Sequence, residues 1–87
     1  MKEPAATGDL ESTLAQTGSF SFLDVEGTVN LVNRSRNGQL KYTEIHRDGP
    51  RYYLERADWP AISGRRFDHL AQMRTALLRM GMTYKPL

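Results

Sequence analysis

The fold is decided by residues 20–56, which read FSFLDVEGTVNLVNRSRNGQLKYTEIHRDGPRYYLER. Three dipeptides ending in glycine, Glu26-Gly27, Asn37-Gly38 and Asp48-Gly49, follow one another at intervals of eleven residues. Glycine reaches the positive φ angles that two-residue hairpin turns need, and Asn-Gly and Asp-Gly favour type I′ turns. The segments between the turns are rich in β-branched and aromatic residues, which fit a pleated sheet. The stretch therefore predicts a four-stranded antiparallel β-meander.

The predicted strands are residues 19–25, 28–34, 39–47 and 51–57, and counting outwards from two-residue turns assigns each side chain to a face. One face collects Leu23, Val25, Val32, Thr43, Ile45, Tyr52 and Leu54. The other collects Phe20, Phe22, Val29, Leu31, Leu40, Tyr42 and Tyr53, mixed with polar side chains. We expect a helix to cover the first face. The second face is too apolar to remain in water, so we expect the N-terminal segment, a second subunit or a ligand to cover it.

A helix is predicted after the sheet. Asp58-Trp59-Pro60 ends the strand pattern, because proline cannot continue a ladder of hydrogen bonds. Trp59 is predicted to close one end of the core, with an exposed partner contact as the alternative. Ser63 can cap a helix over residues 64–80, where apolar residues recur at helical spacing, and Gly81 can end it. Arg74 falls within the apolar arc, so it needs a partner or must extend to water.

The whole chain is predicted to form one α+β domain: a four-stranded antiparallel β-meander followed by one C-terminal α-helix packed on one sheet face. The domain spans residues 19–87. Residues 1–18 are expected to form a flexible segment, because they are mostly small and polar. A short helix over residues 9–16 is the alternative there, with Leu10 and Leu14 docked on the sheet.

Composition narrows the classes of function. The chain has 87 residues, no cysteine and a net charge of +2, which excludes disulfides, thiolate metal sites and a cysteine nucleophile. No apolar run approaches the roughly 18 residues that a membrane span requires, so a cytoplasmic protein with no membrane association is expected. Residues 1–26 carry a net charge of −4 and residues 27–87 a net charge of +6, and nine of the twelve bases are arginine. Arginine suits phosphate and stacking contacts.

The residues offer little for catalysis. The two histidines, His46 and His69, lie on different predicted elements and lack the spacing of metal ligands. No phosphate-cradling glycine loop and no nucleophile elbow are present, since turns account for the glycines. We therefore predict no catalytic residue, no metal site and no cofactor. A pair between His46 and Glu44 on one strand is geometrically allowed, although a half-exposed surface histidine is the commoner arrangement.

Binding is better represented in the pattern. In a meander, the second turn and the end of the fourth strand lie at the same sheet edge, which collects basic residues beside exposed aromatic ones. The predicted nucleic-acid contacts are Arg34, Arg36, Arg56, Arg65 and Arg66 for phosphates and Tyr42 and Tyr53 for base stacking. The alternative is that these arginines keep a small sheet soluble and block edge pairing, while the aromatics stabilise neighbouring strands.

The predicted order of elements, four strands and then a helix, is similar in outline to single-stranded-DNA-binding coactivators of the Whirly type and to purine-rich-element-binding repeats. That resemblance implies a dimer that binds nucleic acid on its sheet faces. No residue role is carried over from it.

The sequence thus predicts a small non-catalytic binding module whose partner is single-stranded or structured nucleic acid. The half-apolar second face predicts a homodimer that buries this face. Two alternatives remain open. One is a protein-interaction module, such as an accessory protein or inhibitor of a mobile element, that docks through its exposed sheet face. The other is a small enzyme or ligand carrier, which would need a pocket.

Overall fold

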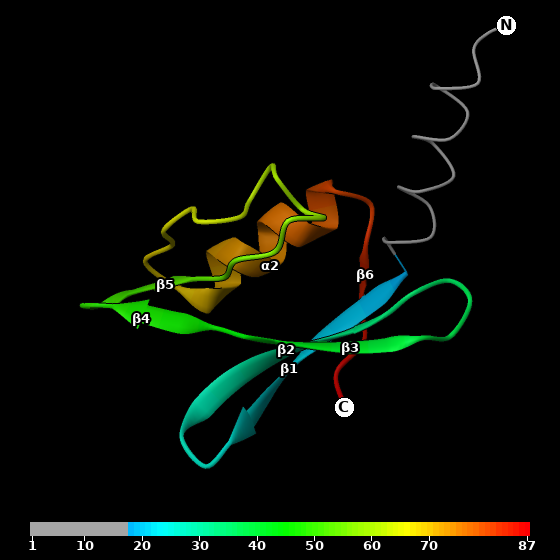
Figure 1. Cartoon of the computed structure of the whole chain (residues 1–87), viewed down its shortest axis with the longest axis horizontal. Helices are drawn as coiled ribbons and strands as arrows, with labels where there is room; N and C mark the ends of the chain where they lie inside the picture. Colours follow the sequence, from blue (N-terminus) through cyan, green and yellow to red (C-terminus); the bar gives the residue numbers. More distant parts are fainter. Residues whose placement is uncertain (1–17) are drawn as a thin grey trace, which may run out of the picture.

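The computed structural model describes residues 18–87 and shows an α+β fold in which one C-terminal helix packs against a mixed sheet (Figure 1). The predicted helix over residues 9–16 and most of the predicted N-terminal segment lie outside the described residues. Strands β1 (Ser19–Val25), β2 (Thr28–Arg34) and β3 (Leu40–Glu44) form an antiparallel meander. The first part of the predicted meander is therefore confirmed.

The first turn has the predicted two-residue form. Val25 pairs with Thr28, and the two residues between them, Glu26 and Gly27, have φ angles of 52° and 88°. Positive φ at both central positions is the requirement of a type I′ turn, whose twist matches the strands beside it. The Oδ1 atom of Asp24 accepts a hydrogen bond of 2.9 Å from the Gly27 N–H, which holds the turn closed.

The second turn is one residue longer than predicted, and this corrects the assignment of faces. The Ser35 N–H donates to the Gln39 carbonyl and the Gly38 N–H to the Ser35 carbonyl, both at 2.9 Å, so three residues form the turn. Gly38 has a φ of 89°, as expected for the last residue of a three-residue hairpin loop. A shift of one residue moves every side chain of β3 to the other face. Tyr42 consequently pairs with Val32, not with Asn33, the partner that a two-residue turn would give.

The third turn is displaced by one position. Asp48 pairs with Arg51, which leaves Gly49 and Pro50 in the turn, and Gly49 supplies its φ of 62°. The flanking strands β4 (His46–Asp48) and β5 (Arg51–Tyr53) form a two-stranded sheet of their own. The single four-stranded meander was thus wrong: the predicted third strand is interrupted at Ile45, and the fourth ends at Tyr53.

The segment between β5 and the helix folds over the core. Tyr52 and Phe67 exchange two backbone hydrogen bonds of 2.8 Å, which keep the chain extended at Phe67. The helix was predicted to begin at Gly64, but the extended chain at Phe67 prevents this, and α2 spans Leu70–Arg79. His69 is its N-cap, and the Gln72 side chain accepts hydrogen bonds from the backbone N–H groups of Asp68 and His69, at 2.8 and 3.3 Å. The predicted cap was wrong, because Ser63 accepts a hydrogen bond of 2.8 Å from the Arg56 N–H.

The helix ends where the sequence predicts, with Met80 as C-cap and Gly81 at a φ of 98°. After it, β6 (Thr83–Tyr84) pairs with β1 in parallel, so the sheet has the order β3-β2-β1-β6 and is mixed, not purely antiparallel. Arg74 is exposed, and its guanidinium carbon lies 5.4 Å from the centre of the Tyr84 ring. The apolar arc of the helix is therefore narrower than predicted, since Leu78 is exposed as well.

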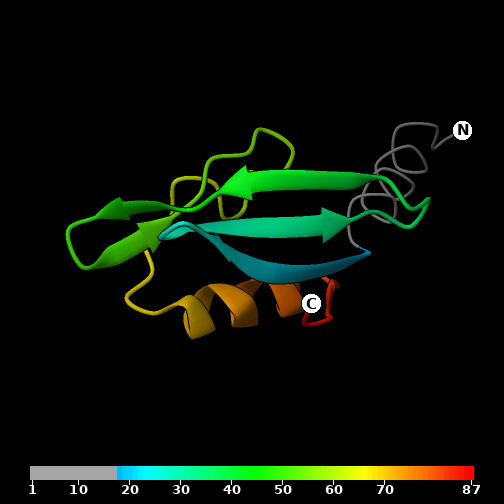
Figure 2. The same ribbon diagram turned by 90° about the horizontal axis from the view of Figure 1, so that it is seen from below.

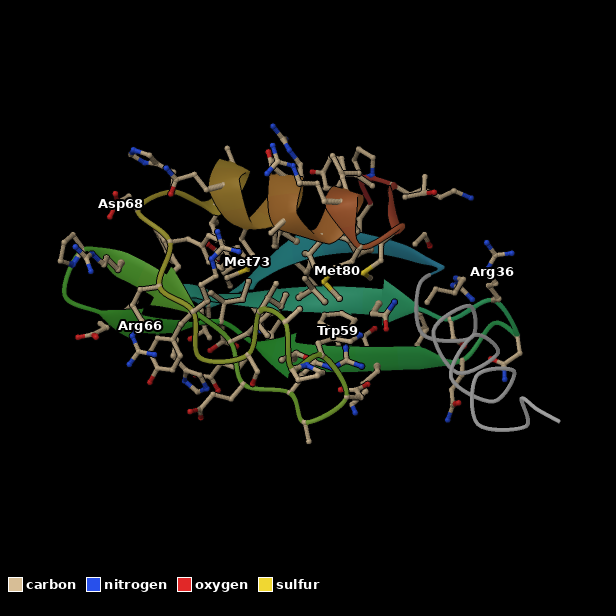
Figure 3. The ribbon with its side chains drawn as sticks, turned by 90° about the horizontal axis from the view of Figure 1, so that it is seen from above. Arg36, Trp59, Arg66, Asp68, Met73 and Met80 are labelled. Carbon is tan, nitrogen blue, oxygen red and sulfur yellow. The ribbon has the colours of Figure 1, made fainter. Side chains whose placement is uncertain are left out.

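The core lies between α2, the segment after β5 and one face of the sheet, as the positions of Trp59, Met73 and Met80 show in Figure 3. Its buried members are Phe20, Leu31, Ile45, Leu54, Trp59, Ile62, Phe67, Met73, Leu77 and Met82. The helix thus covers the face of Phe20 and Leu31, opposite to the face predicted. Trp59 is 2% exposed, which confirms its predicted place in the core.

Candidate nucleic-acid interface

The sheet surface that points away from α2 is the first feature of the candidate site, and we call it the open face. Side chains alternate along a strand, and cross-strand partners share a face. Leu31 belongs to the core, so its neighbour Val32 and the partners of Val32, Ser21 and Tyr42, lie on the opposite side. The open face comprises Ser19, Ser21, Leu23, Val25, Thr28, Asn30, Val32, Arg34, Leu40, Tyr42 and Glu44. Figure 2 views the sheet from this side.

A groove with a volume of about 320 Å³ lies at one end of the open face, where the β2–β3 turn meets β6. We call it the basic groove. It is lined by Gly18, Ser19, Arg34, Ser35, Arg36, Gly81, Thr83 and Lys85. Three of these side chains are basic, none is acidic, and three carry hydroxyl groups. That combination offers charge and hydrogen-bond donors to the oxygen atoms of a phosphate.

Backbone pairing brings the three bases of the basic groove together. Ser19 pairs with Thr83 in the parallel ladder, and the Lys85 N–H donates to the Phe20 carbonyl at 2.8 Å. Lys85 is thereby placed beside the start of β1. Arg34 ends β2, which pairs with β1, and therefore lies at the same end of the sheet. The pairing of β6 with β1 thus adds Lys85 to the cluster that contains Arg34 and Arg36.

The bases of the basic groove are free of acidic partners within residues 18–87. Arg34 donates from Nη1 to the Gly38 carbonyl at 3.2 Å, which holds its side chain over the turn. Arg36 and Lys85 are exposed, and none of the ion pairs in the described region includes either of them or Arg34. An anion that binds here would therefore not need to displace a carboxylate of residues 18–87.

The acidic side chains of the β1–β2 turn lie away from the basic groove. Asp24 and Glu26 belong to the β1–β2 turn, at the opposite end of a ladder seven residues long. A strand rises by about 3.4 Å per residue, so roughly 20 Å separates the two ends. This distance exceeds the Debye length of about 8 Å at physiological ionic strength, so the bases create a local positive field that Asp24 and Glu26 do little to cancel.

Tyr42 supplies an exposed aromatic ring close to Arg34. Tyr42 is 59% exposed and lies two positions along β3 from Leu40, the cross-strand partner of Arg34. Tyr42 and Arg34 are therefore diagonal neighbours on the open face, within reach for long side chains. A planar group stacked on Tyr42 would therefore lie within reach of the Arg34 side chain.

The structure does not bring the predicted set of basic residues together. Arg34, Arg36 and Tyr42 share one end of the sheet, whereas Arg66 lies at the opposite end of the molecule from Arg36 (Figure 3). Arg65 adjoins Arg66. The predicted proximity rested on a fourth strand that runs back along the whole of the third, but β5 pairs only with β4, in the separate two-stranded sheet, and ends at Tyr53.

Arg56 lies inside the fold, although it was predicted as a phosphate contact. It is 6% exposed, and its Nε and Nη2 atoms donate to the two carboxylate oxygens of Asp58 at 3.0 and 2.5 Å. Its Nη1 atom lies 3.5 Å from Asn33 Oδ1 and 3.4 Å from Thr43 Oγ1. The guanidinium carbon is 3.6 Å from the centre of the Trp59 ring. The hydrogen bonds from Arg56 lower the pKa of Asp58, against the effect of its partial burial.

Tyr53 is half-buried and already in contact with two side chains. The Arg66 guanidinium carbon lies 3.7 Å from the centre of its ring, and the His46 ring centre lies at 5.2 Å. Arg66 also donates from Nε to Asp48 at 3.1 Å and from Nη1 to the Gly64 carbonyl at 2.7 Å. These contacts tie the segment before α2 to the β4–β5 hairpin. A base could stack on Tyr53 only after some of them were broken.

Sequence reasoning missed Lys85, because nothing in a two-residue strand near the C-terminus predicts a parallel pairing with β1. The only signal was a β-branched and an aromatic residue, Thr83 and Tyr84, after a helix-ending glycine.

Other kinds of site find little support in the described part of the chain. No cluster of three or more histidine, aspartate and glutamate side chains there could hold a metal ion. His46 Nδ1 lies 3.7 Å from Glu44 Oε2, as the sequence allowed, in an exposed pair. Among residues 18–87, no helix has the length and apolar character needed to span a bilayer.

In comparisons with known proteins, no family model, no curated protein and no solved structure matches the chain.

Proposed function

We propose that the protein is a non-catalytic module that binds single-stranded nucleic acid at the basic end of its open face. The observation that carries the proposal is the acid-free groove formed by Arg34, Arg36 and Lys85 beside the exposed ring of Tyr42. Proteins that bind single strands combine a positive groove for the backbone with aromatic side chains on which bases stack. Both parts lie on one surface here.

A single strand fits this surface better than a duplex. Bases of a duplex are paired and stacked inside the helix, so they cannot lie on Tyr42, whereas the bases of a single strand are free to do so. The surface is also small, with one exposed ring diagonal to Arg34 and two further cations in the groove beyond it, which matches a few nucleotides. Serine and threonine hydroxyls between the cations, at Ser19 and Thr83, offer further donors to phosphate or sugar oxygens.

Fluorescence anisotropy with a labelled single-stranded oligonucleotide at low salt tests the proposal. Arg34→Glu combined with Arg36→Glu should abolish binding, because two phosphate contacts become repulsive. Arg65→Glu combined with Arg79→Glu is the matched control: the change in net charge is the same, but both residues lie outside the basic groove. This variant should retain most of the affinity. Absence of binding by the wild-type protein, or an equal loss in the two double variants, would contradict the proposal.

Substitution of Tyr42 tests the contribution of base stacking separately from that of the phosphate contacts. Removing an aromatic platform costs about 1–3 kcal/mol for each stacked base, which corresponds to a loss of about 5- to 150-fold in affinity. Tyr42→Ala should therefore weaken binding of a single strand, and Tyr42→Phe should retain it. If Tyr42→Ala binds as well as the wild type, bases do not stack on this ring.

A second candidate, docking of a protein strand, is favoured by one observation. β3 is the outer strand of the four-stranded sheet, and Leu40, Lys41 and Tyr42 are all exposed along it. An exposed edge can pair with a strand of another chain, including a second copy of this one. Sedimentation analysis should then detect a dimer that survives high salt and is weakened by Leu40→Lys. The same substitution adds a positive charge and should not weaken nucleic-acid binding, so the two candidates give different results.

A further inference from the structure

A second groove, with a volume of about 500 Å³, lies between α2 and the segment that precedes it. It is lined by Ala61, Ile62, Arg65, Arg66, Phe67, Gln72, Thr75, Ala76, Arg79 and Met80. We call it the amphipathic groove. It shares no residue with the basic groove, so an inference about it does not depend on the proposed function.

The floor of the amphipathic groove is apolar and rigid. Ile62 and Phe67 are buried members of the core, and Ala76 and Met80 pack against that core. Phe67 is further fixed by its two backbone hydrogen bonds to Tyr52. A ligand that enters the groove would therefore meet preformed apolar surface, which reduces the ordering cost of binding.

The helix contributes one wall of the groove at helical spacing. Gln72, Thr75, Ala76 and Arg79 recur at intervals of three and four residues and so form one stripe along α2. This stripe adjoins the stripe of Met73 and Leu77 that faces the core. The wall thus passes from apolar at its base to polar and charged at its rim.

The rim of the groove is positively charged. Arg66 is held by Asp48, Gly64 and Tyr53, as described above, so it acts as a fixed wall. Arg65 lies with its guanidinium carbon 5.1 Å from the centre of the Phe67 ring. No ion pair of the described residues includes Arg65 or Arg79, and no acidic side chain lines the groove.

We propose that the amphipathic groove binds a small amphipathic anion, with a carboxylate, sulfonate or phosphate group attached to an apolar chain or ring. Arg65 and Arg79 bind the anionic group, and Ile62, Phe67 and Met80 contact the apolar part. The volume falls within the range of about 300–1,000 Å³ that is typical of small-molecule sites, and an apolar floor with a few polar groups at the rim is their usual composition. A neutral apolar compound would leave both cations unpaired.

The dye anilinonaphthalene sulfonate tests the proposal, because its fluorescence rises when its rings enter apolar surroundings. We expect saturable binding to the folded protein, displaced by decanoate but not by decanol. The uncharged dye phenylnaphthylamine, which has the same rings without the sulfonate, should bind at least about tenfold more weakly, since a hydrogen bond to a charged group is among the stronger contacts in proteins.

Substitutions locate the site. Arg65→Gln and Arg79→Gln should each weaken dye binding by about tenfold, while Arg74→Gln, on the other side of α2, and Arg36→Gln, in the basic groove, should leave it unchanged. Thr75→Phe, at an exposed position, should fill the groove and block the dye. Equal displacement by decanol and decanoate, or dye binding that is unchanged in the Arg65 and Arg79 variants, would overturn the proposal. Loss in the Arg36 variant alone would also overturn it, because the dye would then occupy the basic groove.

Discussion

Removal of the Asp58 carboxylate is the most informative test of how the fold is held together. Asp58 neutralises Arg56, whose side chain is only 4% exposed, through hydrogen bonds from two guanidinium nitrogens. Asp58→Ala leaves that cation buried next to Trp59 without a counter-ion. Breaking one partner of a buried pair costs about 3–5 kcal/mol, and we expect about 3 kcal/mol here. The lower end applies because Asp58 is itself 26% exposed, and because Arg56 retains its contacts with Asn33 and Thr43.

Urea denaturation followed by circular dichroism measures this loss as a shift of the midpoint at unchanged slope. For a domain of this size, about 3 kcal/mol corresponds to a decrease in melting temperature of more than about 10 °C. Asp68→Ala is the matched control, because Asp68 and Arg51 form an exposed pair at 3.3 Å with side chains 64% and 58% exposed. That variant should lose less than about 1 kcal/mol. If the two variants lose equal stability, the reasoning about the buried arginine is refuted.

Three further predictions concern a backbone glycine, the stability of the fold at low pH and a core side chain. Gly18→Ala should lower the free energy of unfolding by at least about 1 kcal/mol more than Gly49→Ala. Both glycines have positive φ, but only at Gly18 would an added Cβ overlap a backbone carbonyl, that of the last residue of β2. Equal losses of stability in thermal unfolding of the two variants would contradict the packing at Gly18. The lowered pKa of Asp58 stabilises the fold above the unfolded pKa of about 4, and this contribution should disappear as the pH falls through the folded value; Asp58→Asn should flatten the acid limb of stability against pH. Met73→Ala should cost about 2–5 kcal/mol, because Met73 is fully buried, and a loss below about 1 kcal/mol in urea would argue against its place in the core.

The sequence predicts those parts of the fold that depend on local chemistry. Glu26-Gly27 forms the expected type I′ turn, and Gly81 ends the helix with the expected positive φ. The burial of Trp59 follows from its place between strand and helix. In each case the determining interactions lie within a few residues of the signal.

The remaining differences arise from two backbone pairings, one within the second turn and one between distant segments. Ser35 pairs with Gln39 and makes the second turn three residues long, which moves Tyr42 to the open face. Phe67 binds Tyr52 instead of entering the helix, and this delays the start of α2. Neither choice is visible in composition or periodicity, since both sequences also suit the alternative that was predicted.

In the candidate site, too, residues placed by local sequence were predicted and residues placed by tertiary contacts were not. Arg34, Arg36 and Tyr42 were recognised because they flank one turn, and they remain together in the structure. Arg56 was misjudged, because an arginine at the end of a strand resembles a surface residue until Asp58 and Trp59 fold back onto it. The binding roles of all these residues remain predictions.

The salt dependence of nucleic-acid binding tests the central proposal most directly. Each phosphate contact with a single strand contributes about −0.7 to the slope of log K against log salt concentration, so three cations should give about −2. Arg34→Gln should change this slope by about 0.7 towards zero, and Arg65→Gln should leave it unchanged. Slopes that are equal in the wild-type protein and the Arg34 variant, or no measurable binding at low salt, would contradict a nucleic-acid interface at the basic groove.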